Sequence, residues 1–495
     1  MQTNHQMKVS GEVPVHKWWV MCGVGGGILM ATLDSSIVNI ALPTLIDQLH
    51  TDLATVQWVV LSYILVLTST MLGAARLGDM YGKKKLYLLG LAIFTVSSLL
   101  CGLAPSVGWL ISARALQGLG GSLMQALGIA IVTEAFPPLE RGRAMGIVGS
   151  IVSVGIAMGP PLGGLLIGMV SWHAVFLVNV PVGILTWFVV VQNVPLTAAR
   201  PGQKFDLPGA LLLLFTLTCY GLGMTLGQNV GFGVGQVVAL LLAAAGGLGA
   251  FFLLEAQLAQ PMVDLRLFHN LLFSLNLLMG FLVFSVLSGT FIIPFFLQFV
   301  KGYTIQEVGF LLMAMPLSMG LISPWAGTLS DHYGPRAISL LGLSCLVCGC
   351  LGLGFLDPKM AGLDFVLRVI PMGVGFGLFQ ASNNSAIMSA APRESLGVAS
   401  GLLQLMRTLG QTSGLPLMGA LFTGVTQYSM TATENKSDIT KASGFALTQG
   451  VNGTFRVAAF VILGSTILAA IALWLDSRQQ KAAKAALALK VGLPD

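Results

Sequence analysis

The sequence predicts an all-α polytopic membrane protein. Of its 495 residues, 55% are hydrophobic and only 9% are charged, whereas about a quarter of the residues of a soluble domain are charged. The apolar residues form long continuous runs, unlike the short alternating strands of a membrane barrel. A chain with so few charges cannot cover a water-exposed surface of its own size, which excludes a soluble fold.

Fourteen of these runs (14 spans) are long enough to cross a bilayer, for which a helix needs about 20 predominantly apolar residues. The first run contains Asp34 and is too long for the apolar region of a signal peptide, so we expect the mature protein to keep it. The runs lie near residues 18–42, 54–76, 86–104, 107–132, 144–168, 172–192, 207–228, 234–256, 271–299, 305–327, 336–356, 363–390, 397–424 and 452–475.

The distribution of Lys and Arg predicts the orientation of the chain. If the N-terminus is inside, most of the 25 Lys and Arg residues fall in cytoplasmic segments, and the outer loops contain only Lys301, Lys359, Lys436 and Lys441. Cytoplasmic loops are normally enriched in positive charge, so both termini are predicted to be cytoplasmic. The net charge of +6 then reflects orientation, and we expect no nucleic-acid partner.

Two loops repeat one pattern. The loop after the second span reads Leu-Gly-Asp79-Met-Tyr-Gly82-Lys-Lys, and the loop after the tenth reads Leu-Ser-Asp331-His-Tyr-Gly334-Pro-Arg. The number of residues between the two loops is larger than six membrane-spanning helices need, and the excess is enough for two more helices. Parallel repeats of this kind are typical of transporters, with the substrate site near the membrane midplane between the halves.

The repeat predicts the domain organisation. We expect an N-terminal six-helix bundle over residues 1–200, an inserted two-helix hairpin over 201–260 and a C-terminal six-helix bundle over 261–476. A cytoplasmic tail over 477–495 is rich in Lys and Ala. It either forms a short amphipathic helix on the inner leaflet or is disordered.

Several motifs resemble those of a known family. The loop that contains Asp79 resembles the signature loop of the major facilitator superfamily, and other segments are similar to motifs of that superfamily or of its fourteen-helix drug:proton antiporter family, the EmrB/QacA type. The resemblance covers the whole chain and implies the major facilitator fold. These segments are Leu33-Asp34-Ser-Ser-Ile-Val-Asn39-Ile-Ala-Leu-Pro43, Arg114-Ala-Leu-Gln117-Gly-Leu-Gly, Gly155-x-x-x-Gly159-Pro160-Pro-Leu-Gly163-Gly164 and Trp172-His-x-x-Phe176-x-x-Asn179-x-Pro181-x-Gly183.

The resemblance implies which residues carry the conformational change. The glycines of span five also have a simpler interpretation as close helix packing, although the two prolines there interrupt the backbone hydrogen bonds and bend the helix. The signature loop departs from the usual pattern at Ala75 and Met80, where Gly and Arg are usual, which weakens the charge network expected around Asp79. The predicted gating residues are Asp79, Gly82, Lys83, Lys84, Asp331, Gly155, Gly159, Pro160, Gly163 and Gly164.

Asp34 is the strongest candidate for proton coupling, because it is the only acidic residue deep within an apolar span. An ionisable residue at that depth is costly and indicates function. Asp34 lies about 12 Å from the outer end of its span and Arg114 about 10 Å from the outer end of span four, so the two can pair. The protonation of such a carboxyl group depends on conformation and hydration. The alternative is a static ion pair that locks two helices together.

Span thirteen carries Gln404, Arg407 and Gln411 on one helical face. Since a polar stripe gains nothing by facing lipid, we expect it to face a substrate cavity. Arg407 would hold a substrate anion, repel cations or bond backbone carbonyl groups. Further predicted cavity residues are Asn39, Tyr63, Gln117 and Asn383.

The favoured function is proton-coupled antiport: efflux of lipophilic or amphiphilic small molecules, as in multidrug exporters. Antiport and efflux follow from the resemblance. The alternatives are an exporter of one metabolite or lipid, such as a fatty acid, an amino acid or a siderophore, and, more remotely, a membrane enzyme or a receptor without transport. The sequence contains no H-E-x-x-H motif and no Walker lysine pattern. We expect a multi-pass monomer of the cell membrane that contacts lipid, protons and lipophilic substrates, with no metal and no cofactor beyond the proton gradient.

Overall fold

The computed structural model describes residues 17–51, 53–196, 206–258, 261, 263, 265–392, 395–430 and 443–491, and every regular element within these ranges is helical. The first seven helices form the first six predicted spans, because α6 and α7 together make the sixth. They are α1 (Lys17–Gln48), α2 (Leu53–Tyr81), α3 (Lys83–Gly102), α4 (Val107–Ala135), α5 (Arg141–Met169), α6 (His173–Leu177) and α7 (Asn179–Asn193).

The remaining helices follow the predicted order. The ninth span is interrupted near Pro294, where a 3-10 turn (Ser288–Ile292) and a π turn (Phe296–Val300) flank α11. Proline lacks an N–H group, and such local adjustments satisfy the backbone around it. The helices are α8 (Leu207–Val230), α9 (Gly235–Gln257), α10 (Leu271–Leu287), α11 (Ile293–Phe295), α12 (Ile305–Leu312), α13 (Ala314–Tyr333), α14 (Pro335–Leu353), α15 (Gly362–Ala390), α16 (Leu396–Ser429) and α17 (Gly444–Val491).

Thirteen helical stretches of the described chain are long and apolar enough to cross a membrane. Each of the fourteen predicted spans coincides with helix, and α16 is the one that is not among the thirteen. The reason is its polar stripe of Gln404, Arg407 and Gln411. The prediction of many membrane-crossing helices is therefore confirmed, whereas the number fourteen stays a prediction.

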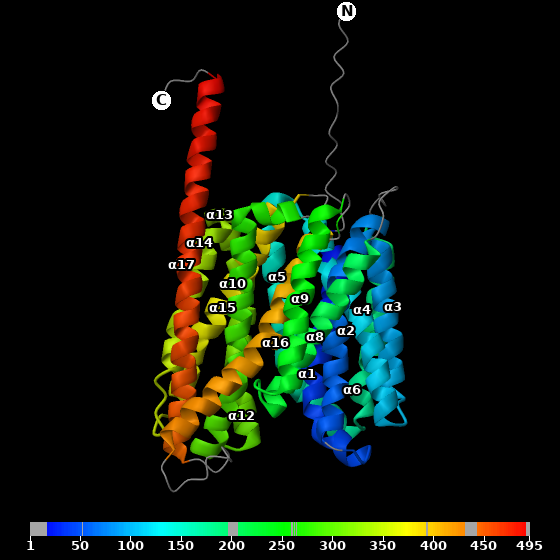
Figure 1. The fold of residues 1–495 in the computed structure, drawn as a ribbon, viewed down its shortest axis with the longest axis vertical. Coiled ribbons are helices and arrows are strands. Elements are labelled where there is room, and N and C mark those ends of the chain that lie inside the picture. Colours follow the sequence, from blue (N-terminus) through cyan, green and yellow to red (C-terminus); the bar gives the residue numbers. More distant parts are fainter. Residues whose placement is uncertain are drawn as a thin grey trace, which may run out of the picture.

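The predicted tail differs from expectation. Instead of a separate short helix or a disordered segment, α17 continues without a break from Gly444 to Val491 and extends beyond the bundle (Figure 1). No glycine or proline occurs between Gly464 and Gly492, and Ala, Leu and Lys are strong helix formers. Local propensity thus carries the helix past the last span. Residues 492–495 lie outside the described ranges.

The helices stand side by side in two groups. In Figure 1, α1–α4 lie on the right, α10, α13–α15 and α17 on the left, and α8 and α9 stand in front, where α8 packs against both α2 and α16. Between the groups, α5 packs against α13 and α2 packs against α16. The helix α1 begins and α17 ends on one side of the bundle (Figure 1), which we call the terminal side. This side is the predicted cytoplasmic one.

The two repeated loops fold into the same tight turn. Gly82 joins α2 to α3 with φ 98°, and Gly334 joins α13 to α14 with φ 86°. Only glycine adopts positive φ without steric cost. The repeated glycine is therefore explained by backbone geometry, and it brings each preceding Asp to the end of its helix.

The turn at Gly334 offers a test, because a Cβ atom there would meet nothing within 4 Å. Gly334→Ala should destabilise the fold by about 1–2 kcal/mol through backbone strain alone, which lowers the midpoint of thermal unfolding in detergent. Gly464→Ala is the matched control: it also has open space around it but lies within α17, so it should leave the midpoint unchanged or raise it. Equal midpoints for Gly334→Ala and the wild type would contradict this explanation.

Candidate functional site

Asp34 in α1 and Arg114 in α4 form a buried ion pair. Arg114 Nη1 lies 2.5 Å from Asp34 Oδ2, and their side chains are 1% and 0% exposed. Two buried amides donate hydrogen bonds to Asp34 Oδ1: Gln117 Nε2 at 3.0 Å and Asn179 Nδ2 at 2.9 Å. Removing such a pair from water costs several kcal/mol per ion, which only good geometry and further hydrogen bonds offset. We call these four residues the acid–base cluster.

The guanidinium group has partners besides the carboxylate. Arg114 Nε donates to the carbonyl oxygen of Val59 at 3.0 Å, and Nη1 also donates to Gln117 Oε1 at 2.5 Å. The Arg114 guanidinium carbon stands 4.3 Å from the centroid of the Tyr63 ring, a favourable cation–π distance. The positive charge of Arg114 is therefore stabilised from three directions that do not depend on Asp34.

The sequence anticipated only part of this cluster. Equal depths in two spans predicted the contact between Asp34 and Arg114, and the structure brings them together. Gln117 was predicted to line the cavity, but its side chain lies in the cluster and also donates to Ser98 Oγ at 2.8 Å. Asn179 was noticed only as part of a motif. Its polar side chain at the start of an apolar span was the signal that could have identified it.

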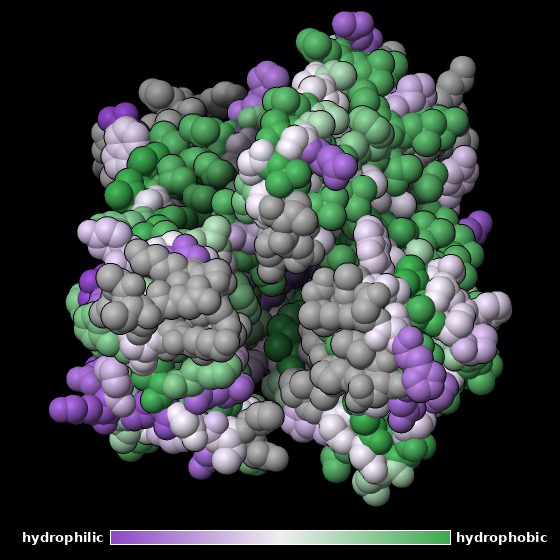
Figure 2. Space-filling model, turned by 60° about the horizontal axis from the view of Figure 1, so that its bottom comes forward, coloured by the Kyte–Doolittle hydropathy of each residue, from purple (hydrophilic) through white to green (hydrophobic). Residues whose placement is uncertain are grey.

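A cavity of about 1340 Å³ lies between the two groups of helices. Figure 2 looks onto the side opposite the terminal side and shows a hollow with apolar side chains at depth. The cavity is lined by residues of α1, α2, α4, α5, α8, α10–α13, α15 and α16. The inserted helix α8 contributes Tyr220, which shares a short hydrogen bond with Ser413 of α16. The insertion thus forms part of the cavity wall.

Four predicted cavity residues line this cavity: Tyr63, Gln404, Arg407 and Gln411. Arg407 Nη1 donates to Gln404 Oε1 at 2.7 Å, and Gln404 Nε2 lies 3.4 Å from Oε1 of Gln125 in α4. Gln125, which the sequence analysis missed, therefore joins the two groups of helices. Its signal was the same as that of Gln117, a lone amide in an apolar span.

One further predicted residue lies elsewhere, and the structure does not describe the side chain of another. Asn383 is buried in α15, beside a small void that Arg407 also lines, and is not part of the large cavity wall. Asn39 falls within α1, but its side chain lies outside the described part of the structure.

Tyr63 connects the cavity with the acid–base cluster. Its side chain lines the cavity, and its ring carries the Arg114 guanidinium. On α1, Thr32, Ser35 and Ser36 line the cavity, while Asp34 between them faces Arg114. One helix therefore presents hydroxyl groups to the cavity and a carboxylate to the cluster behind it.

On the terminal side, Asp79 caps a helix of the other group. Its Oδ1 and Oδ2 accept hydrogen bonds from the backbone N–H groups of Gly397 and Val398, at 3.0 and 2.9 Å, in the first turn of α16. A negative charge at a helix N-terminus is favourable. Lys83 Nζ lies 2.8 Å from Asp79 Oδ1 and 2.9 Å from Glu134 Oε1. The signature loop usually has Arg at the position of Met80. In this chain Lys83 supplies the positive charge next to Asp79 instead.

Asp331, from the repeated loop, makes the equivalent contact in the opposite direction. Its carboxylate accepts hydrogen bonds from the backbone N–H groups of Gly142 and Arg143, at 2.8 and 2.9 Å, at the start of α5. A Cβ atom on Gly142 or Gly397 would collide with the capping carboxylate, so both helices need glycine there. The two caps hold the groups together on the terminal side.

The other predicted gating residues have different surroundings. Gly155 and Gly159 pack against Thr32 and Ser36 of α1, as the packing interpretation of span five predicts, and Ser36 Oγ donates to the carbonyl oxygen of Gly155 at 3.1 Å. Lys84 Nζ donates to the carbonyl oxygen of Val191 at 2.8 Å. In α5, Gly163 is buried and Gly164 is exposed to the cavity, whereas the side chain of Pro160 lies outside the described part.

The profile of a known transporter family matches residues 24–415 of this chain. The chain belongs to the Major Facilitator Superfamily. Relatives include the riboflavin transporter RibZ of Clostridioides difficile, 33% identical over 82% of this chain and 88% of RibZ, and the multidrug resistance protein Stp of Mycobacterium tuberculosis, 34% identical over 81% and 75%. The tetracenomycin C resistance and export protein of Streptomyces glaucescens is 34% identical over 82% of this chain and 76% of its own length.

A solved structure supports the fold of this Major Facilitator Superfamily member. The crystal structure of the human organic anion transporter MFSD10 (TETRAN) has a TM-score of 0.68 and covers 92% of this chain and 99% of its own, at 16% sequence identity. The chain is therefore a multi-pass membrane transporter rather than an enzyme.

The Asp79 cap predicts how the terminal side responds to a loss of charge. Asp79→Asn keeps a capping oxygen but loses the negative charge that meets α16 and Lys83. The closed arrangement should weaken by about 1 kcal/mol, roughly a fivefold change in the ratio of closed to open molecules. Spin labels at the exposed positions Lys85 and Tyr333, in a chain without its native cysteines, report this as added long distances.

Asp357→Asn is the matched control, because Asp357 is exposed and its Oδ1 bonds only the nearby backbone of Lys359 in the described structure. It should leave the distance distribution unchanged. Identical distributions for Asp79→Asn and the wild type would show that the cap does not hold the terminal side closed.

Proposed function

We propose that this transporter exports small lipophilic or amphiphilic molecules in exchange for protons, as a member of the fourteen-helix antiporter group within its superfamily. It would work by alternating access in the cell membrane as a monomer, with the terminal side in the cytoplasm. Relatives named for multidrug resistance and for resistance and export support the direction and breadth of transport.

The acid–base cluster is the observation that carries the proton coupling. Asp34 is a fully buried carboxylate in a membrane-crossing helix, and such residues mark proton pathways. When Asp34 takes up a proton, its attraction to Arg114 weakens. Arg114 keeps the Val59 carbonyl, Gln117 Oε1 and the Tyr63 ring as partners. After protonation of Asp34, the positive charge of Arg114 therefore still has partners within the membrane interior. An ion pair with a purely structural role would not need these additional partners.

The position of the cluster supports communication with the cargo. Tyr63 separates Arg114 from the cavity, and α1 carries both Asp34 and the cavity hydroxyl groups of Thr32 and Ser35. A bulky cargo that moves the Tyr63 ring or α1 changes the hydration of Asp34. Hydration in turn decides whether the carboxyl group keeps its proton.

The two aspartate caps complete the cycle. While Asp79 and Asp331 hold the terminal side closed, the cavity opens to the opposite side. In this state, cargo leaves and Asp34 takes up a proton from outside. When the caps separate, the cavity opens to the cytoplasm, where Asp34 releases its proton and new cargo enters.

Export of one metabolite is the second candidate. The relative named riboflavin transporter is as similar to this chain as those named for drug resistance, so similarity alone does not favour a broad cargo range. The size of the cavity favours a broad cargo range over a single metabolite, because about 1340 Å³ exceeds the usual volume of a small-molecule site, about 300–1,000 Å³.

Inverted membrane vesicles with an imposed proton gradient test this proposal. The wild-type protein should accumulate a panel of lipophilic dyes when the interior is acidic. Asp34→Asn should abolish this accumulation, because an amide cannot exchange a proton, while membrane insertion stays unchanged. Asp357→Asn should transport like the wild type.

The outcomes distinguish the candidates. Gradient-driven transport that survives in Asp34→Asn would remove Asp34 from coupling, and accumulation of one metabolite alone would favour the second candidate. The absence of any solute movement, with the wild-type protein inserted, would favour a receptor.

A further inference from the structure

We propose that the cavity selects organic anions with an aromatic body and that Arg407 binds their acidic group. This inference rests on the proposed function for its site, because it names the class of cargo that the same cavity takes. It commits to a charge of the cargo, and that charge follows from the residues of the cavity wall alone.

The described part of the cavity wall carries a single fixed charge. Among the described residues that line it, Arg407 is the only one with a charged side chain, and the lining contains neither Asp nor Glu. The charges of Asp34 and Arg114 lie behind Tyr63 and compensate each other. A ligand in the cavity therefore meets a net positive charge. In surroundings of low dielectric constant, that charge attracts anions and repels cations far more strongly than it would in water.

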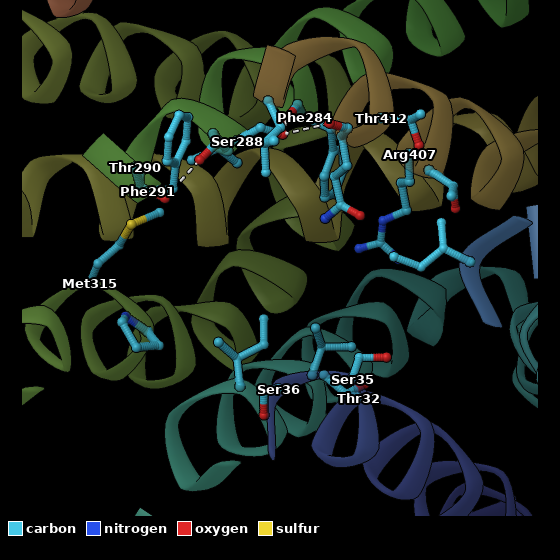
Figure 3. A pocket seen from close by; sticks show the side chains of 18 of the residues that line it. Thr32, Ser35, Ser36, Phe284, Ser288, Thr290, Phe291, Met315, Arg407 and Thr412 are labelled. Carbon is cyan, nitrogen blue, oxygen red and sulfur yellow. Dashed lines mark hydrogen bonds between the residues drawn. The ribbon is translucent and has the colours of Figure 1, made fainter. Parts of the chain in front are cut away.

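Arg407 is available to a ligand. Its one described hydrogen bond goes from Nη1 to Gln404 Oε1 at 2.7 Å, and none of the ion pairs in the described part of the chain involves it. Since a guanidinium group has five N–H donors, most of them remain for other partners. Figure 3 shows the Arg407 side chain directed from α16 into the cavity, with Thr32 and Ser35 of α1 on the opposite wall.

The surroundings of Arg407 favour a flat apolar body next to the acidic group. The Arg407 guanidinium carbon lies 4.8 Å from the centroid of the Phe284 ring, and Phe291, Phe376 and Tyr220 also line the cavity. Aromatic rings pack well against one another in offset or edge-to-face arrangements. A small inorganic anion would gain nothing from these walls, so both the charge and the aromatic body are needed for binding.

A pair of dyes tests the charge preference. Fluorescein is anionic and rhodamine 123 is cationic, while both contain the same three-ring xanthene body. Fluorescence anisotropy on the purified protein at pH 8, with no gradient, should show fluorescein binding at least about tenfold tighter than rhodamine 123. Arg407→Met, which keeps the length of the side chain but removes its charge, should weaken fluorescein binding about tenfold or more, as expected for a hydrogen-bonded charge.

Two further variants keep the test decisive if Arg407→Met does not fold. Gln411→Glu places a negative charge on the cavity face of α16 and should shift the preference toward rhodamine 123. Lys85→Met removes an exposed positive charge on the terminal side and should change neither affinity. Equal or tighter binding of rhodamine 123 by the wild type would overturn the proposal. Undiminished fluorescein binding by folded Arg407→Met or by Gln411→Glu would also overturn it.

This experiment is separable from the test of proton coupling. Asp34→Asn should still bind fluorescein at least as tightly as the wild type and rhodamine 123 more weakly, because Arg407 stays in place and the charge of Arg114 behind Tyr63 is no longer compensated. Charge-selective binding without gradient-driven transport would uphold the anion site and remove the export proposal. Gradient-driven transport of both dyes with equal affinity would uphold the export proposal and remove the anion site.

Discussion

The buried contact between Asp34 and Arg114 is the interaction on which the rest of the proposed mechanism depends. Charged groups within a membrane span are costly, and the chain uses four helical segments to stabilise this pair: α1 and α4 carry the ions, α7 supplies the Asn179 amide and α2 supplies the Val59 carbonyl. The two ions differ in their other partners. Arg114 also contacts the Val59 carbonyl, Gln117 and the Tyr63 ring, so its charge stays stabilised when Asp34 is protonated. Such asymmetry suits a group that changes its charge during a cycle.

The other charged residues of the membrane region lie at separate places and make different contacts. Asp79 and Asp331 meet backbone N–H groups across the interface on the terminal side, so the internal repeat produces two equivalent closures. Arg407 is the single charged side chain of the described cavity wall. In the proposed cycle, the proton, the closure and the cargo each have their own ionised residue, and Tyr63, α1 and α16 are the elements that join them.

Much of the fold could be predicted because its causes are local. Hydropathy and length located the thirteen stretches of the described chain that are long and apolar enough to cross a membrane, and the repeated Asp and Gly residues located the two turns. The contact of Asp34 with Arg114 followed from depth alone. The contact of Asn179 with Asp34 and the backbone partners of the two caps could not be predicted, because they depend on the rotation of helices and on contacts between segments far apart in the sequence. Gln117 was predicted to line the cavity but lies in the acid–base cluster, because depth in the membrane does not tell which side of α4 faces the cavity. The continuous α17 was missed because a predicted span boundary was taken as a helix end.

The central claim is that the Asp34 carboxyl group takes up and releases a proton within the folded protein. Infrared difference spectroscopy on purified, membrane-reconstituted protein during a pH titration tests it directly. Our account predicts that the carbonyl stretch of a protonated carboxylic acid appears as the pH falls through the range that supports transport, and that this band is missing in Asp34→Asn. A spectrum in which that band never appears, or appears equally in Asp34→Asn, would mean that the pair is a static link between two helices.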